Sequence, residues 1–342
     1  MNAPLVSVIM PIHNAARYLP AAINSVLRQS CADWELIAVE DGSDDASLTV
    51  ANRFAAQDRR IRVESMGRNT GTAAARNTAI ALARGKFLAF LDADDIALPL
   101  RLAVQVRAIA HAPRGAISCS AVELIDGTDS PTGASCFDGP PECVLPTLLF
   151  RNVIANSTVL TAREGFVGFR SGYEPAEDYD AWLRAAPGAT VLYSRRPLIR
   201  YRMHMSSVSA RSQERMDAVR RRIVAETLSR LNAPADSEAV DFHVQIADGA
   251  FAPTLASMNR AETWLLTLRD ANQASRLFCE EPFARVLTRH WHSICNGCWT
   301  IAEEAARRLS ASPLAGPMLD RLLLSARLRL RGAAAKCRRK HR

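Results

Sequence analysis

The sequence has no apolar run that could cross a membrane, because none approaches the roughly 18 to 20 residues that a membrane helix needs. Its N-terminus, MNAPLVSVIMPIHN, has neither a basic leader nor an apolar stretch followed by a cleavage site, so it does not read as a secretory signal. We therefore expect a cytoplasmic protein whose eight cysteines are reduced.

The usual glycine-rich phosphate loops are missing as well. The chain has no G-x-x-x-x-G-K-[ST] motif, and no G-x-G-x-x-G follows its first apolar run. A protein that binds a nucleotide diphosphate without such a loop needs another way to offset the charge. Carboxylates that hold Mg²⁺ or Mn²⁺ would do so, because both ions prefer hard oxygen ligands.

An excess of positive charge is confined to the end of the chain. The net charge is +8, yet the stretch RLRLRGAAAKCRRKHR (327–342) holds eight Lys and Arg and no acid, so residues 1–326 carry 35 basic and 35 acidic side chains. Such an end is either solvated or lies on an anionic membrane surface, where each basic residue contributes about 1 kcal/mol. We do not expect nucleic-acid binding, because no aromatic residues interleave with the charges. If the end lies on a membrane surface, the protein would be peripheral on the inner face of that membrane.

A regular alternation of strand and helix dominates the first 125 residues. Continuous apolar runs predict strands at 6–12, 35–40, 61–65 and 86–91, and helical stripes follow each of them, the last two at 71–85 and 99–111. Asp44 or Asp45 is expected to cap the second helix, and Gly85 to end the third. This order indicates an α/β fold with a parallel sheet and right-handed crossovers.

The rest of the chain is less regular at first and then helical. Residues 126–175 are rich in Gly, Pro and Thr, a helix is expected within EPAEDYDAWLRAA (174–186), and two short strands at 189–194 and 198–204. Almost everything from 211 to 332 has the pattern of amphipathic helices. We expect an α/β domain at 1–208, a helical extension at 209–332 and a basic tail at 333–342.

Acidic residues collect where two predicted strands end. EDGSDD (40–45) follows the second strand, and DADD (92–95) follows the fourth, while the only cation soon after is Arg101. Parallel sheets bind ligands outside the carboxyl ends of their strands. Asp92 and Asp94 are two residues apart and can face the same side. A lone D-x-D is common by chance, but here it comes with a second acidic loop and a downstream Glu-Asp pair.

Three segments together are similar to the family 2 glycosyltransferases. They are VSVIMPIHNAARYLPAAINSVLRQSCADWELIAVEDGSDDAS, NTGTAAARNTAIALARGKFLAFLDADDIALP and EDYDAWLR, and the resemblance covers about residues 5–205. It implies the GT-A fold, a mostly parallel sheet flanked by helices, with a nucleotide-sugar half at about 1–110 and an acceptor half at about 111–208. It also implies inverting transfer from a nucleotide-diphosphate sugar to a glycan or lipid-linked acceptor, assisted by Mn²⁺ or Mg²⁺, in surface polysaccharide synthesis.

The resemblance assigns the donor-binding residues one by one. Pro11, His13 and Asn14 resemble the loop that borders the nucleotide base, although an aromatic is more usual at His13. Asp41 resembles the carboxylate that accepts from the base, with Glu40 where a second Asp is usual.

A second group of residues resembles those that bind the phosphates and the metal. Arg76 and Asn77 resemble residues that face the nucleotide and its phosphates, and Asp92 the ribose-side or metal-side carboxylate. Asp94 resembles the metal ligand, and His204, in YRMH, a second ligand or a diphosphate contact.

The same resemblance makes Asp178 the general base, with Glu177 or Asp180 as fallbacks, and Asp95 a residue that caps or orients the following helix. Two other functions stay open. A nucleotidyltransferase of the nucleotide-sugar pyrophosphorylase type is disfavoured because no glycine- and lysine-rich loop follows the first strand. An inactive nucleotide-sugar-binding module is disfavoured because each expected acid is present.

A cluster of His and Cys in RHWHSICNGCW suggests a second kind of site. His292, Cys295 and Cys298 would share a helical face, with His290 nearby. A zinc site needs four converging ligands, usually with two from a separate segment, and no such second pair is evident. We therefore interpret these residues as packing between helices.

Overall fold

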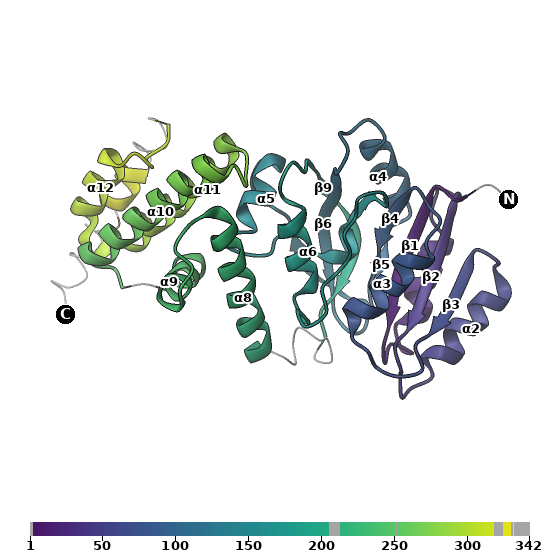
Figure 1. Cartoon of the computed structure of the whole chain (residues 1–342). Helices are drawn as coiled ribbons and strands as arrows, with labels where there is room; N and C mark the ends of the chain where they lie inside the picture. The colour runs from purple at the N-terminus through teal and green to yellow at the C-terminus, as the bar shows by residue number, and fades with distance from the viewer. Residues whose placement is uncertain (1–2, 205–212, 251, 318–323, 330, 332–342) are drawn as a thin grey trace. The chain divides into compact units, whose positions relative to one another are not determined.

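The computed structural model describes residues 3–204, 213–250, 252–317, 324–329 and 331 (Figure 1). The chain divides into an α/β unit, Met1–Val144 with Asn152–Arg220, and a helical unit, Leu145–Arg151 with Arg221–Arg342. The domain boundary that we predicted at 208/209 and the tail predicted at 333–342 lie outside the described residues. The helical unit includes a short segment, Leu145–Arg151, that the sequence places inside the predicted α/β domain.

Strand and helix alternate through the α/β unit as predicted. Its elements are β1 (Val6–Ile12), α1 (Leu19–Leu27), β2 (Trp34–Glu40), α2 (Ser47–Gln57), β3 (Ile61–Ser65), α3 (Thr72–Leu82), β4 (Phe87–Phe90), β5 (Ile96–Ala97), α4 (Arg101–Ile109), β6 (Ile117–Ile125), β7 (Pro131–Ser135), the 3-10 helices η1 (Pro141–Cys143) and η2 (Asn156–Thr158), β8 (Leu160–Ala162), α6 (Glu177–Ala185) and β9 (Val191–Arg202). A short helix, α5 (Val144–Thr147), spans the point in the sequence where the α/β unit gives way to Leu145–Arg151.

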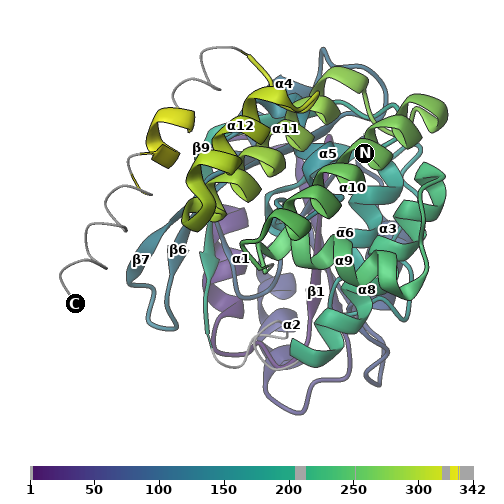
Figure 2. The same ribbon diagram turned by 90° about the vertical axis from the view of Figure 1, so that its left-hand side faces the viewer.

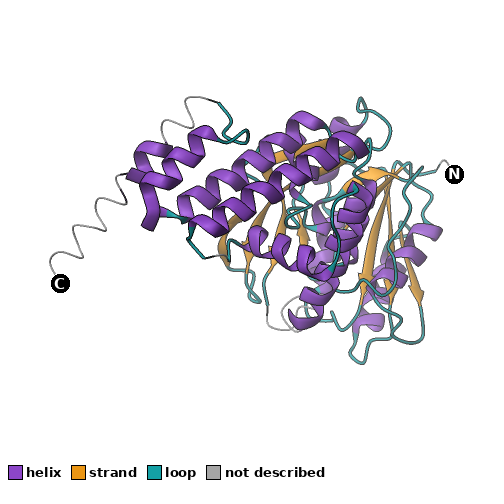
Figure 3. Ribbon diagram, turned by 60° about the vertical axis from the view of Figure 1, so that its left-hand side comes forward, coloured by secondary structure: helices purple, strands orange, loops and turns teal. Residues whose placement is uncertain are grey.

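These strands form one sheet in the order β3-β2-β1-β4-β8-β6-β9-β5, with β7 paired to β6. Strands β3, β2, β1 and β4 are mutually parallel, whereas β8 runs antiparallel to β4 and β6. Helices cover the sheet, drawn in orange in Figure 3. Buried residues of β1, β2 and β4 and of α1 form the core between sheet and helix. The predicted α/β architecture, with helical structure after it, is confirmed.

Two predicted helix boundaries are wrong. Helix α2 has Ala46 at its N-cap and no side-chain cap, because Asp45 instead accepts from the backbone N–H and the hydroxyl of Ser47. Helix α3 ends at Leu82, and Gly85 lies beyond it, against β1. A Cβ at Gly85 would lie 2.5 Å from the backbone nitrogen of Ser7, so this glycine permits a close approach of two strands.

The two short strands predicted at 189–194 and 198–204 are a single strand, β9, which passes through the Arg-Arg-Pro sequence at 195–197. It pairs in parallel with β6, and the register shifts between Ser120 and Val122. That irregularity absorbs the break in the apolar pattern. The β6–β7 hairpin, which the sequence analysis did not anticipate, is clear in Figure 2.

The helical unit consists of α9 (Ser237–Asp248), α10 (Leu255–Ser275), α11 (Glu280–Gly297), η3 (Trp299–Ile301), α12 (Ala302–Ala311) and most of α8 (Gln213–Leu231). Helices α10 and α11 pack together, and α12 packs on α11. In the described residues, no helix combines the length and the apolar character that a membrane span requires.

Candidate active site

The acidic cluster that follows β4 is divided between three environments. Asp92 is partly exposed and is fixed on both sides: its backbone N–H donates to Ser157 Oγ at 3.0 Å, and its Oδ1 accepts from Arg76 Nη2 at 2.7 Å. Asp94 is also partly exposed, whereas Asp95 is 1% exposed. Asp92 and Asp94 can therefore contact a ligand, whereas the buried Asp95 cannot.

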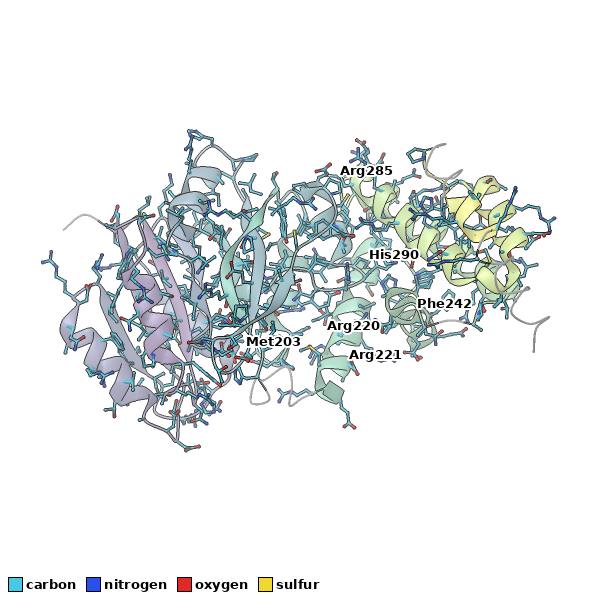
Figure 4. All side chains as sticks on the ribbon, turned by 180° about the vertical axis from the view of Figure 1, so that it is seen from behind. Met203, Arg220, Arg221, Phe242, Arg285 and His290 are labelled. Carbon is cyan, nitrogen blue, oxygen red and sulfur yellow. The ribbon has the colours of Figure 1, made fainter. Side chains whose placement is uncertain are left out.

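Asp94 and His204 come from distant parts of the chain and meet here. Nε2 of His204 lies 2.9 Å from Oδ2 of Asp94, and the ring of Tyr18 packs on the histidine at 4.9 Å between centroids. Met203, between the buried Arg202 and His204, points to solvent and is 55% exposed (Figure 4). The alternation at the end of β9 thus turns His204 toward the D-x-D.

A divalent metal fits this pair, although the protein supplies few ligands. Among the described residues, no three or more His, Cys, Asp or Glu gather as a metal cluster. Mg²⁺ and similar ions commonly take only one or two protein ligands and fill the remaining positions with substrate phosphates and water. One carboxylate and one imidazole facing each other at 2.9 Å suit that kind of shared site.

Asp95 does not cap the following helix, which was one of the two roles predicted for it. The N-cap of α4 is Leu100, and Oδ1 of Asp95 instead accepts from the backbone N–H of Arg202 at 2.9 Å. Burial, followed by the charges of Asp94 and Asp92, raises the pKa of Asp95. Its role is to tie the D-x-D loop to β9.

One buried arginine bridges the two acidic motifs. Arg76, on α3, donates to Asp92 and also to Oε1 of Glu177, the first residue of α6. Burial alone would lower the pKa of Arg76, but the charges of Asp92 and Glu177 outweigh it and raise that pKa, so the guanidinium stays charged. Asn77 engages the backbone N–H and C=O of Phe169 at 2.9 and 2.7 Å, and the ring of Phe169 faces Arg76.

Asp178 is next to this bridge. Its Oδ1 accepts from the backbone N–H of Tyr179 at 2.7 Å, and its Oδ2 faces Nδ2 of Asn152 at 3.4 Å. Burial, and then the charge of Glu177, raise the pKa of Asp178 to about 7, while Arg76 opposes the shift. A carboxylate that titrates near neutral pH is suited to accept a proton from a substrate.

The loops after β1 and β2 form a separate polar cluster. Asp41 is buried, and its carboxylate accepts from Thr70 N–H and from Gly71 N–H at 2.7 and 2.8 Å. Nδ1 of His13 lies 2.9 Å from the backbone oxygen of Asp41, and its Nε2 lies 3.1 Å from Nδ2 of Asn69. A single tautomer satisfies both contacts, with Nδ1–H donating to the carbonyl and Nε2 accepting from the amide.

Asn14 and Pro11 belong to the same two neighbouring segments. Asn14 has a positive φ of 49°, and its side-chain oxygen accepts from the backbone N–H of Asp44 at 2.9 Å. Pro11 is in β1, where it pairs with Val39 of β2. The structure therefore places the predicted base-side residues together, at the carboxyl ends of neighbouring parallel strands.

The His and Cys cluster of α11 is engaged in packing within the helical unit. His290 stacks on Phe150 at 3.8 Å between centroids, and burial lowers the pKa of His290 to about 3. Nε2 of His292 lies 2.9 Å from the backbone oxygen of Ala315, and Cys295 and Cys298 are buried.

Sequence reasoning missed three residues that shape the site. Glu177 was named only as a fallback base, yet it holds Arg76. Arg202, between the Tyr and the His of YRMH, donates to the backbone oxygen of Asp94 at 2.7 Å. Asn152, beside Asp178, belongs to a stretch with no recognisable pattern. Only Glu177 and Arg202 lie inside the motifs EDYD and YRMH, so the sequence pattern could have indicated only these two residues.

A family model described as glycosyl transferase family 2 matches residues 7–173. Over 212 residues, or 61% of this chain, the sequence is 33% identical to the Escherichia coli UDP-Glc:alpha-D-GlcNAc-diphosphoundecaprenol beta-1,3-glucosyltransferase WfgD, of which the match covers 81%. It is also 44% identical over 95 residues to an uncharacterised glycosyltransferase of Haemophilus influenzae. That match covers 28% of this chain and only 38% of the relative.

A solved structure shares the fold. The S. aureus TarS 1-349 structure in complex with UDP-GlcNAc superposes with a TM-score of 0.54 at 17% identity, covering 88% of this chain and 92% of TarS 1-349. The agreement extends beyond the residues that the family model matches.

Proposed function

Because the chain belongs to glycosyl transferase family 2, we propose that it transfers a sugar from a nucleotide-diphosphate sugar to a hydroxyl group of a glycan or lipid-linked acceptor, with inversion at the anomeric carbon. The observation that carries the proposal is the bridge through Arg76. It joins Asp92, at the end of β4, to Glu177, next to Asp178. A donor held at the D-x-D would therefore have a proton acceptor close by.

In the proposed reaction, Asp178 takes the proton from the acceptor hydroxyl as its oxygen bonds to the anomeric carbon. The bond from that carbon to the diphosphate oxygen breaks, and the nucleoside diphosphate leaves. Attack from the face opposite the leaving group inverts the anomeric centre. A positioned base of this kind typically contributes about 10² to 10⁴ in rate.

Asp94 and His204 would hold a divalent metal with the diphosphate, and Asp92 lies on the same side. The bound ion would offset the charge that develops on the leaving diphosphate. Arg76 stabilises this side of the site by donating to Asp92. Asn77 does so by donating to the backbone oxygen of Phe169.

The donor is proposed to be a UDP-sugar, with its base against Pro11, His13, Asn14 and Asp41. TarS 1-349 was crystallised with UDP and with UDP-GlcNAc, and WfgD is named for UDP-Glc and a diphosphoundecaprenol-linked GlcNAc. The acceptor would accordingly be a lipid-diphosphate-linked sugar, and the process the synthesis of a polysaccharide.

Paired variants of Asp178 and Asp94 test this proposal. Asp178→Asn keeps the size of the side chain but cannot take a proton, so kcat should fall by about 10²-fold or more while UDP affinity with Mn²⁺ changes by less than about 1 kcal/mol. Asp94→Asn removes an anionic ligand and should abolish the Mn²⁺ dependence of UDP binding. The assays are UDP release from UDP-glucose and UDP-GlcNAc with a lipid-linked GlcNAc acceptor, and calorimetry with UDP.

The same assays separate the alternatives. A nucleotidyltransferase would release pyrophosphate from a nucleoside triphosphate, and an inert module would bind UDP without turnover. Near wild-type transfer by Asp178→Asn would show that Asp178 is not the base, and Asp180 or Glu177 would be examined next.

A further inference from the structure

Asn152 lies beside Asp178 but has no role in the proposed mechanism. It is exposed, yet its amide has a defined orientation, because Oδ1 accepts from the backbone N–H of Ile154 at 3.0 Å. That bond fixes Oδ1 and turns Nδ2 toward Oδ2 of Asp178, 3.4 Å away. The other carboxylate oxygen is held by the N–H of Tyr179. The two donors together fix the plane of the carboxylate.

We propose that Asn152 is a positioning residue for Asp178: its amide orients the carboxylate that receives the acceptor proton. The proposal rests on the proposed function, since it takes Asp178 to be the base. A base must be held within hydrogen-bond reach of that proton, so a small displacement costs rate.

Asn152→Ala tests the proposal. Without the amide the carboxylate loses one donor to its ionised form, so kcat should fall by about 10-fold or more, with UDP affinity and acceptor KM within about twofold of wild type. Gln273→Ala, which removes an exposed amide from α10, is the matched control and should leave all three unchanged.

Asn152→Asp adds a readout that a merely structural role would not move. The groups that face Asp178 are Glu177 on its own helix, Arg76 on α3, Asp92 after β4 and Tyr201 on β9. A further negative charge 3 to 4 Å away disfavours ionisation of Asp178. The acidic limb of the kcat profile should therefore move to higher pH, and by more than in Asn152→Ala.

Each result decides the proposal. Unchanged kcat in Asn152→Ala, or a rise in acceptor KM alone, overturns the positioning role. If Asp178→Asn is inactive while Asn152→Ala is fully active, only the positioning proposal fails. If Asp178→Asn keeps its turnover, the proposed mechanism fails with it.

Discussion

At the scale of single residues, the site is a balance between carboxylates and one buried cation. Arg76 pairs with Asp92 and Glu177, so their charges are offset, whereas the two oxygens of Asp178 accept from the backbone N–H of Tyr179 and the amide of Asn152. Burial and the charge of Glu177 then raise the pKa of Asp178 to about 7. Of these three neighbouring acids, Asp178 is thus the one suited to serve as the proposed base.

The raised pKa of Asp178 predicts that the folded protein loses stability as pH rises. A folded-state pKa raised above the unfolded value of a carboxyl gives stability that is complete below about pH 4 and is lost as pH rises through about 7. Asp178→Asn should therefore melt higher than wild type at pH 8, by about 2 to 4 °C for a gain on the order of 1 kcal/mol. The difference should shrink at pH 5.

Differential scanning calorimetry at both pH values would measure this effect. Glu214→Gln, which neutralises an exposed acid on α8, serves as the control. An equal difference in melting temperature at pH 5 and pH 8 would show that the ionisation of Asp178 does not contribute to stability.

At the scale of elements, close contacts between strands decide where the acidic loops stand. Gly85 precedes β4, and its N–H donates to Ser7 Oγ of β1 at 2.8 Å. β1 is held on its other side by β2, so its backbone has no room to retreat. The contact at Gly85 fixes the start of β4, and four residues of strand then lead to the D-x-D.

Gly85→Ala should therefore destabilise the α/β unit. The added Cβ would lie 2.5 Å from a backbone nitrogen and 2.8 Å from a backbone carbon of β1, and overpacking of this kind typically costs about 1 to 3 kcal/mol. Urea unfolding would measure the loss, with Lys86→Ala, at the neighbouring exposed position, as the control. Equal midpoints for the two variants would contradict the tight contact.

At the scale of the whole molecule, the chain joins an α/β unit to a helical unit of which the glycosyl transferase family 2 model matches only Leu145–Arg151. The helical unit takes this segment from the middle of the sequence, so the two units are interwoven in the chain and are not simply consecutive. The positive charge excess is concentrated in residues 327–342.

The charged end predicts binding to anionic membranes. Deleting 333–342 removes five Lys and Arg but spares Leu328, which is buried. Binding to vesicles that contain phosphatidylglycerol should weaken and lose its salt sensitivity, because each removed charge contributes about 1 kcal/mol near such a surface. Sedimentation measures binding, and vesicles of phosphatidylcholine are the control. Equal binding by the full-length and shortened proteins would rule out the membrane role of the tail.

The sequence by itself determined the α/β class, the four parallel strands and the acidic loops at their ends. These features are local: an apolar run of β-forming residues, a turn and an amphipathic stripe each show within a dozen residues. The family resemblance added the likeness of D-x-D, EDYD and YRMH to known motifs. Where the local pattern was broken, as at Arg195 and Arg196 in β9, the prediction was wrong, because pairing with β6 carries the strand through.

Only the tertiary structure decided what surrounds the carboxylates. The sequence near DADD offered Arg101 alone, but Arg101 binds the backbone oxygen of Phe90, and the cations that reach the motif are Arg76 and Arg202. Arg202 is more than 100 residues away in sequence from its partner Asp94. A charge partner is set by distance in space, so no local pattern can reveal it. The same reason hid Asn152, which reaches Asp178 only because the fold brings the chain back there.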